Sequence, residues 1–331
     1  MTVVTPNTDA GPSIERSLRL SFMGDWGHAN FHRVLGYLGM HVLVRSGPHT
    51  KFAIWNGDGF AGNLRAVAYG EADVTLTTPA SWATMATDGL GPYSSEPLPE
   101  LRALGVLPHR DRVIFTVRAD TNITSFADLR EHSGPLRIAT SSPESTSYVG
   151  LAVDQVLRRS GIPPEEIEAR GGKLLFRGGS WECIKLLESG QADAVFHEAM
   201  MTPPWQQMAK NQPMNFLAVE DSVLDEVWNE YRWPRADIPE GQFEGLDEPV
   251  PTLDFSDWLV LCRSDMPDDV AYLLTWALVT QRAGIDKYYE HIPVERSPLW
   301  YPIDPHALGK AAIQLHPGAA QLYDELGLRD A

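Results

Sequence analysis

The chain has 331 residues, which suggests two domains or one large one, and 43% of them are hydrophobic, enough for a sizeable core. Its net charge of −17 argues against nucleic acids and anionic membrane surfaces as partners. The two cysteines, Cys183 and Cys262, lie in apolar runs, so buried thiols are expected rather than a disulfide or a metal site.

The first 16 residues form a polar stretch that predicts a loose tail. This stretch has neither the basic region nor the apolar region of a signal peptide. No run of roughly 18 apolar residues predicts a membrane span. As written, the sequence therefore predicts a cytoplasmic protein with no membrane insertion. If an export signal is missing from the sequence, the location would be periplasmic or extracellular.

The first third of the chain alternates strand and helix signals. A strand is expected over 18–22, followed by a helix in which Phe31, Val34, Leu35 and Leu38 recur at helical spacing. A second strand is expected over 41–45. A turn over 56–60 then leads to a helix that Gly70 ends, and a third strand spans 73–77.

The same alternation continues to the end of the chain. Residues 112–117 predict a buried strand, Ser125 an N-cap with Asp128 three residues on, and 136–139 a strand that enters a hydroxyl-rich loop over 140–147. Further strands are expected over 173–176, 194–196, 215–219 and 257–262, and helices over 149–157, 181–188, 222–230 and 267–281. Residues 231–251 are an irregular excursion, and 305–327 are two helices.

A short internal echo indicates two lobes of like build. Gly70-Glu71-Ala72-Asp73 returns as Gly190-Gln191-Ala192-Asp193, each time after an amphipathic helix and before a short strand. Alternating strands and helices form mainly parallel sheets flanked by helices. We therefore expect an α/β fold with a tail over 1–16, lobe 1 over 17–117 and 250–331, and lobe 2 over 118–249.

In such sheets, ligands bind beyond the carboxyl ends of the strands. Five loops occupy these ends in the predicted order of elements: 24–28, 56–60, 77–82, 140–147 and 197–205. Two lobes would close these loops around one ligand cleft.

The order of motifs resembles the TAXI-type solute-binding proteins of tripartite ATP-independent periplasmic (TRAP) transporters, a branch of the type II periplasmic binding protein fold. The motifs that carry the resemblance are Gly57–Leu64 followed by Gly70–Asp73, Val117–Asp120 followed by Asp128-Leu129, the Ser142–Thr146 loop, Ile238–Gly245, and Leu315-His316-Pro317-Gly318-Ala319 with Tyr323. The resemblance spans residues 18 to 327. It implies a two-lobed protein that binds a small organic molecule, often a carboxylate, and works with a membrane transporter subunit when exported.

Acidic side chains set this sequence apart from the family pattern. The first loop, rich in Gly and Thr in the family, carries Asp25 and His28 here, and Asp58 and Glu144 replace small residues. With Glu198, four carboxylates would face one ligand if all reach the cleft. Like charges within a few ångströms repel, so some of them would need protons, cations or a metal.

The candidate ligand-binding residues lie at the loop ends. Aromatic side chains there suit an apolar or ring-shaped ligand, although lobe packing explains each one equally well. Hydroxyls at a helix N-terminus could donate to a carboxylate or simply cap the helix, Asn63 could bond a helix terminus instead, and Arg177 could be a solvated loop charge. The set comprises Trp26, Gly27, Gly59, Phe60, Asn63, Thr78, Ser81, Trp82, Ser142, Ser145, Thr146, Arg177, Met200 and Trp205.

The sequence favours a binding protein for a small polar organic molecule, with a carboxylate and an apolar or aromatic part. The alternative is a cytoplasmic enzyme on the same fold with decarboxylase or lyase-type chemistry, suggested by the absence of a signal peptide and by the loops rich in acids and histidine. The resemblance allows it, because non-transport members of this fold act on small carboxylates, including as decarboxylases. The candidate acid and base groups of such an enzyme are Asp25, His28, His197 and Glu198, although a helix cap also explains Asp25. No cofactor is expected, and the spacing predicts no metal site.

Overall fold

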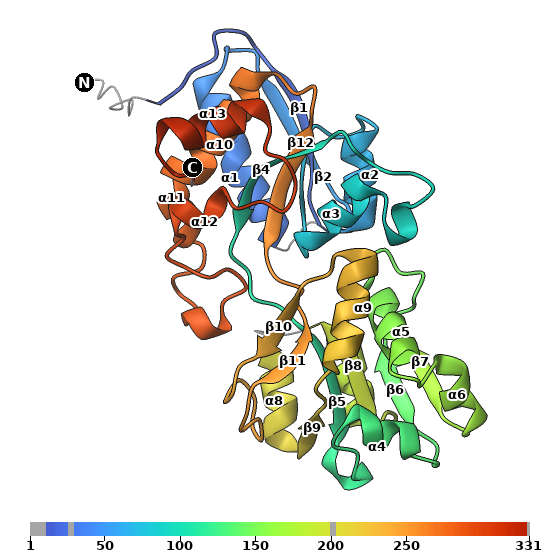
Figure 1. The fold of residues 1–331 in the computed structure, drawn as a ribbon. Helices are drawn as coiled ribbons and strands as arrows, with labels where there is room; N and C mark the ends of the chain where they lie inside the picture. The colour runs from blue at the N-terminus through green and yellow to red at the C-terminus, as the bar shows by residue number, and fades with distance from the viewer. Residues whose placement is uncertain (1–10, 26–29, 199–202, 330–331) are drawn as a thin grey trace.

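A computed structural model of the chain describes residues 11–25, 30–198 and 203–329. Two lobes face each other, each built on a five-stranded sheet flanked by helices, and two chain segments connect them (Figure 1). The two-lobed α/β architecture predicted from the sequence is thus confirmed.

The sheet of lobe 1 has the strand order β2-β1-β3-β12-β4. Its strands are β1 (Arg19–Met23), β2 (Lys51–Trp55), β3 (Val74–Thr77), β4 (Leu101–Leu107) and β12 (Trp258–Arg263). Strand β12 runs antiparallel to both of its neighbours, so the other four strands share one direction. The start of β12 therefore lies at the same edge of the sheet as the ends of β1, β2 and β3.

Helices cover both faces of this sheet, because its buried strands carry apolar side chains on each face. Along β3, Val74 and Leu76 pack with the helices of one face, whereas the hydroxyl of Thr75 meets Asn63 on the other. The first face holds α1 (Asn30–Arg45), α10 (Asp268–Thr280) and α13 (Pro317–Glu325), and the second holds α2 (Ala61–Ala68) and α3 (Ser81–Asp88). Short helices α11 (Arg282–Asp286) and α12 (Pro305–Leu308) and the 3₁₀ segments Gly91–Tyr93 and Val294–Arg296 complete the lobe.

Lobe 2 repeats this plan with the order β7-β6-β8-β5-β9. Its strands are β5 (Val113–Arg118), β6 (Arg137–Thr140), β7 (Lys173–Phe176), β8 (Ala194–Glu198) and β9 (Met214–Phe216). Here β5 is the antiparallel strand. The helices are α4 (Phe126–Glu131), α5 (Val149–Arg159), α6 (Pro164–Ala169), α7 (Ser180–Glu188), α8 (Pro203–Asn211) and α9 (Asp221–Tyr231), with a 3₁₀ segment at Ala119–Thr121.

The sequence echo occupies equivalent places in the two lobes. Gly70 and Gly190 have φ angles of +75° and +71°, which end the preceding helices in a conformation that favours glycine. Asp73 then accepts a hydrogen bond from the backbone N–H of Ser21 on β1 at 2.7 Å, and Asp193 accepts one from Arg137 on β6 at 2.9 Å. The same short motif thus fixes the start of β3 against β1 and of β8 against β6.

The two connections between the lobes run side by side. Residues 108–112 lead from β4 to β5, and residues 254–257 lead back to β12, with an isolated bridge between Arg112 and Asp254. The guanidinium of Arg112 donates to the carboxylate of Asp254 at 2.7 Å and to the hydroxyl of Ser256 at 2.5 Å. This one side chain therefore ties the two connections together.

The lobe boundaries and several elements differ from the sequence prediction. The strand β5 was placed in lobe 1, but it pairs with β8 and β9 and belongs to the sheet of lobe 2. The expected strand over 41–45 is the last part of α1, whose apolar spacing continues without a break, and β2 follows it. The 231–251 excursion begins and ends in a hairpin of β10 (Arg235–Ile238) and β11 (Val250–Leu253), so the return to lobe 1 begins at residue 254.

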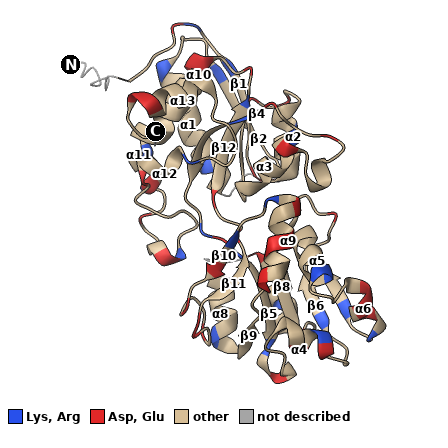
Figure 2. Ribbon diagram, viewed as in Figure 1, with Lys and Arg blue, Asp and Glu red and all other residues tan. Residues whose placement is uncertain are grey.

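Charged residues occupy mainly the outer helices and loops of both lobes, while most of the strand residues are uncharged (Figure 2). This distribution is the one expected for sheets buried between helices. The acidic side chains that lie between the lobes are an exception to this distribution.

Candidate ligand site

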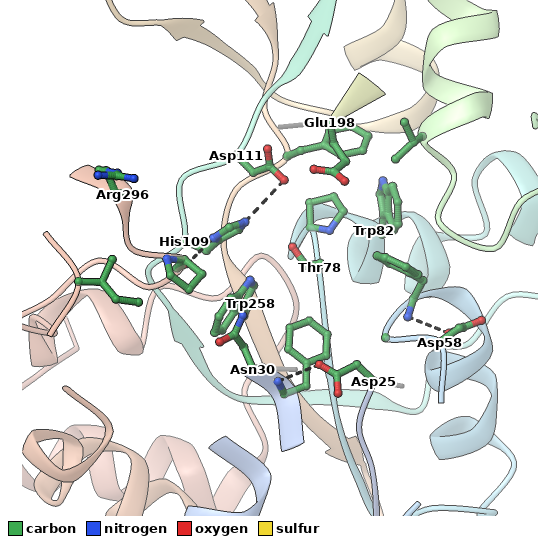
Figure 3. A pocket seen from close by; sticks show the side chains of 18 of the residues that line it. Asp25, Asn30, Asp58, Thr78, Trp82, His109, Asp111, Glu198, Trp258 and Arg296 are labelled. Atoms are coloured by element: carbon green, nitrogen blue, oxygen red, sulfur yellow. Dashed lines mark hydrogen bonds and ion pairs between the residues drawn. The ribbon is translucent and has the colours of Figure 1, made fainter. Parts of the chain in front are cut away.

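A cavity of about 650 Å³ lies between the lobes (Figure 3). Its walls come from the loops after β1, β2 and β3, the end of β8, the starts of α1, α3, α5 and α8, both connections between the lobes, and the start of β12. Three residues of the chain after α11, Ile292, Arg296 and Pro298, complete the wall. The cavity therefore sits at the carboxyl edges of both sheets, where ligands of α/β proteins bind.

Aromatic rings form much of the cavity wall in two groups. Trp82 lies 5.3 Å from Phe255 and 6.1 Å from Phe60, measured between ring centroids. On the other side, Trp258 lies 5.4 Å from Phe31. Since these rings are contributed by both loops and connections, the cavity presents flat apolar surfaces to its contents.

The loop after β1 brings Asp25 to the cavity, where its carboxylate is already engaged. One oxygen accepts the backbone N–H of Phe31 at 3.1 Å, and the other lies 2.7 Å from Nδ1 of His32. Asp25 is almost fully buried, with 3% of its surface exposed. Asp25 thus caps the start of α1. The sequence suggested this role as the alternative to a catalytic one.

The loop after β2 is held from behind by Asn63. The side-chain oxygen of Asn63 accepts the backbone N–H groups of Asp58 and Gly59, at 3.2 and 3.3 Å, and its amide donates to Gly24 O at 2.8 Å and Thr75 Oγ1 at 2.9 Å. The carboxylate of Asp58 accepts the N–H of Phe60 at 2.8 Å. Asn63 is fully buried and does not line the cavity, so it shapes the loop that does.

A second acidic group lies at the lobe 2 end of the cavity. Asp111 comes from the first connection and Glu198 from the end of β8, and both line the cavity. Burial, followed by the negative charge of Asp111 and the hydrogen bond to it, raises the pKa of Glu198 well above its ordinary value. The raised pKa favours the protonated form of Glu198.

The imidazole of His109 lies next to this pair. Its Nδ1 lies 2.5 Å from the carbonyl oxygen of Pro298, and its Nε2 lies 3.6 Å from Asp111. Its ring is also 5.1 Å from that of Trp258. His109 therefore connects the acidic end of the cavity to its aromatic wall.

His197 precedes Glu198 on β8, so in a regular strand its side chain points to the opposite face. Its Nε2 lies 2.8 Å from the hydroxyl of Ser141, at the end of β6, and 2% of the residue is exposed. Burial lowers the pKa of His197 to about 4. It is therefore neutral at pH 7 and does not line the cavity, contrary to the role expected for a catalytic candidate.

The structure brings six of the predicted site residues to the cavity: Asp25, Gly59, Phe60, Thr78, Trp82 and Glu198. Four others, Trp26, Gly27, His28 and Met200, lie outside the described residues. The remaining eight do not line it.

Several of these eight have partners that account for their positions. Trp205 is fully buried in the core of lobe 2, where its ring faces that of Phe243. Arg177 is exposed and donates to the carbonyl of Phe176 at 2.7 Å. Ser81, at the start of α3, is near the cavity wall but not part of it.

The hydroxyl-rich loop before α5 contacts lobe 1 rather than the cavity. The hydroxyl of Ser142 bonds Glu144, and that of Ser145 lies 3.1 Å from Ser147. The carbonyl of Thr146 accepts the N–H of Ala61, the first residue of α2, at 3.3 Å. The N-terminus of α2, which could otherwise bind an anion, is thus partly occupied by the other lobe.

Sequence reasoning missed the residues that reach the cavity from the connections and from β12. These include His109, Asp111, Phe255 and Trp258. A signal was present for two of them, because His109 and Asp111 belong to a charged stretch between two apolar strands. Trp258 was missed because it starts a strand, and only the antiparallel direction of β12 brings that start to the ligand edge.

Neither a metal-binding cluster nor a membrane-spanning helix occurs among the described residues. No group of three or more His, Cys, Asp or Glu residues within residues 11–25, 30–198 and 203–329 is arranged to hold a metal ion. In the same part of the chain, no helix combines the length and apolar composition that crossing a membrane requires.

Known structures share this architecture. XAC2383 from Xanthomonas citri, bound to ATP, aligns with a TM-score of 0.51 and 16% identity over 93% of this chain and 99% of its own. A TctC solute binding protein from Polaromonas aligns with a TM-score of 0.51 and 14% identity over 94% of this chain and 96% of its own. The chain thus has the fold of the two-lobed, type II periplasmic binding proteins. It belongs to the NMT1-like family, whose model matches residues 46–327.

Proposed function

We propose that this chain is a solute-binding protein that takes up a small organic molecule, with an apolar or aromatic body, between its lobes. The observation that carries the proposal is the cavity of about 650 Å³, lined by rings from lobe 1 and the connections and closed by residues of lobe 2. Cavities of roughly 300–1,000 Å³ with mostly apolar walls and a few polar groups are typical ligand sites. The solute-binding fold of the chain supports the same conclusion.

The finer part of the proposal is a TAXI-like role in transport, in which the loaded protein delivers its ligand to a membrane transporter subunit. The motif order from Gly57–Leu64 to the near-terminal His316-Pro317-Gly318 supports it. The two lobes and their paired connections would allow hinge closure over the ligand, as this kind of delivery requires.

A carboxylate on the ligand was expected from the sequence. The cation that such a group would meet among the lining residues is Arg296, with His109 as a second, titratable partner. Four lining side chains are acids instead: Asp25, Asp58, Asp111 and Glu198. The apolar or aromatic body is therefore the part of the ligand that the cavity supports directly.

The test is to incubate the purified protein with a total extract of polar metabolites and identify retained molecules by native mass spectrometry. We expect one predominant small molecule per chain. The Phe60→Ala variant, which removes a ring from the cavity wall, should bind it about tenfold more weakly. Phe176→Ala is the matched control, because Phe176 is an exposed phenylalanine remote from the cavity lining, at 46% exposure. Retention of no small molecule would overturn the proposal.

An enzyme of the lyase or decarboxylase class is a second candidate, because a protonated carboxyl at Glu198 facing the cavity could act as a general acid. The molecule identified in the extract discriminates between the two functions. If it is recovered unchanged after prolonged incubation with the protein, the enzyme candidate fails. If its mass changes in wild-type protein but not in Glu198→Gln, the enzyme candidate replaces simple binding.

A further inference from the structure

The two ends of the cavity differ in how their acids are satisfied (Figure 3). At the lobe 1 end, Asp25 has the N–H of Phe31 and the imidazole of His32, and Asp58 accepts the N–H of Phe60. At the other end, Asp111 accepts the N–H of Arg112 at 2.8 Å, whereas the carboxyl of Glu198 has its described contacts with His197, at 3.6 Å, and with Asp111. Glu198 is therefore the acid of the site that most needs a partner.

Imidazoles are the ion-pair partners of this pair within the described chain. His109 lies 3.6 Å from Asp111, and His197, which is neutral at pH 7, lies 3.6 Å from Glu198. The nearby guanidinium of Arg112 is turned to Asp254 and Ser256 in the connections. The side chains of Asp111 and Glu198 are 11% and 31% exposed, and this partial removal of carboxyls from water is costly unless a positive charge or a proton compensates it. A ligand carboxylate placed here would add a negative charge beside Asp111 and be repelled.

Two more polar groups on the cavity wall lack a partner among the described residues. Trp82 is fully buried, and neither its indole N–H nor the buried hydroxyl of Thr78 has a hydrogen-bond partner there. Both residues line the cavity beside the acidic pair (Figure 3). An acceptor atom on the ligand would satisfy the indole N–H, whereas the hydroxyl of Thr78 can donate or accept.

The aromatic wall of the cavity is suited to a ligand that carries a positive charge. The rings of Trp82 and Trp258 lie on opposite sides of the cavity, and Trp258 also neighbours His109. Cations are attracted to the faces of aromatic rings, most strongly to tryptophan, and more so when water is excluded. Carboxylates surrounded by aromatic rings are a combination that favours organic cations over organic anions.

We propose that the ligand is an organic cation, a molecule with an apolar or aromatic body and a protonated nitrogen that docks on Asp111 and Glu198. This inference rests on the proposed function, since it assigns the ligand class of the same cavity. The nitrogen donates to the two carboxyls, and its positive charge favours release of the proton from Glu198. The rings of Trp82 and Trp258 enclose the body.

Three probes with one ring system test the charge directly: tryptamine, indole-3-propionate and tryptophol, which carry an ammonium, a carboxylate and a hydroxyl on like chains. Calorimetric titration at pH 7.5 should show tryptamine binding at least tenfold more tightly than indole-3-propionate, with tryptophol between them. Equal or tighter binding of indole-3-propionate would overturn the inference, and so would binding of none of the three at millimolar concentration.

Glu198→Gln provides the residue-level test, because glutamine keeps the size of the side chain and can still donate to Asp111. Tryptamine binding should weaken about tenfold to a hundredfold, as expected for a hydrogen bond between charged groups, while tryptophol binding changes less than threefold. Asp111→Asn should behave alike, and Glu240→Gln, an exposed glutamate of lobe 2, should leave both unchanged. An equal loss for tryptamine and tryptophol would contradict charge recognition.

The metabolite extract separates failure of this inference from failure of the proposed function. A retained molecule with a basic nitrogen supports both. A retained organic anion overturns the cation assignment and leaves the binding function standing. If no molecule is retained, both fall together.

Discussion

His197 and Glu198 are consecutive residues of β8, and the fold shifts their pKa values in opposite senses. Burial lowers the pKa of His197 to about 4, so the folded protein resists protonating it. Burial and the neighbouring Asp111 raise the pKa of Glu198, so the folded protein holds a proton there. The imidazole supports the end of β6 through Ser141, whereas the carboxyl faces the cavity. Neighbouring residues at the end of β8 thus have different roles: His197 supports the fold, and Glu198 faces the cavity.

The lowered pKa of His197 makes the stability of the protein depend on pH. Below the ordinary histidine pKa of about 6.5, the unfolded chain takes up a proton that the folded chain refuses until about pH 4. Wild type should therefore lose about 3 kcal/mol of unfolding free energy from this residue between pH 6.5 and pH 4. In His197→Gln that loss is absent, so urea-unfolding free energies of the two proteins should converge as the pH falls.

The control for this prediction is His306→Gln, because His306 is exposed. Its unfolding free energy should follow the wild-type curve at every pH. The raised pKa of Glu198 acts in the opposite direction, stabilising the fold as the pH falls, but it is common to all three proteins and cancels in the difference. Parallel curves for wild type and His197→Gln would contradict the prediction.

At the scale of elements, Asn63 joins three pieces of lobe 1. From the first turn of α2 it reaches the end of β1 at Gly24, the middle of β3 at Thr75, and the loop that carries Asp58 and Gly59. The sequence offered Asn63 as either a helix-terminus bond or a ligand contact, and its burial agrees with the first. Asn63 therefore holds the loop after β2 in its conformation, although Asn63 itself does not line the cavity.

Asn63→Ala should lower the unfolding free energy by about 2–4 kcal/mol, because several buried polar groups lose their partner at once. It should also weaken tryptamine binding, since Gly59 and Phe60 are no longer held in place. Asn211→Ala, at an exposed asparagine at the end of α8, is the matched control and should change the unfolding free energy by less than about 0.5 kcal/mol. A loss of similar size in both variants would show that Asn63 has no special role.

The elements that the sequence predicted well are those with local signals. Ser125 caps α4 by accepting the N–H of Asp128 at 3.1 Å, and β7 has the predicted bounds Lys173–Phe176. The parts of the site that were missed depend on strand direction and on pairing between distant segments, which no local pattern encodes. Asp111 and Glu198 are 87 positions apart in the sequence, from 198 − 111, and meet because β5 pairs antiparallel with β8.

At the scale of the whole molecule, the lobes are joined by packing as well as by their connections. One apolar cluster includes Leu64 and Trp82 of lobe 1 together with Phe115 and Val153 of lobe 2. Tyr148, just before α5, bridges the two parts. Its ring lies 5.2 Å from that of Trp82 and 6.1 Å from that of Tyr93. Because this cluster crosses the boundary, we expect the lobes to unfold together, in one calorimetric transition.

Tyr148→Ala should uncouple the lobes, because it removes the ring that lies between Trp82 and Tyr93. We expect the transition to split or broaden until the van't Hoff enthalpy falls below the calorimetric enthalpy, with a loss of about 3 kcal/mol in the less stable lobe. Tyr148→Phe keeps the ring and should retain the wild-type transition, which separates packing from the hydroxyl. If Tyr148→Ala still unfolds in one transition with equal enthalpies, the coupling resides in the paired connections at Arg112 and Asp254 instead, where a guanidinium rather than an aromatic ring joins the lobes.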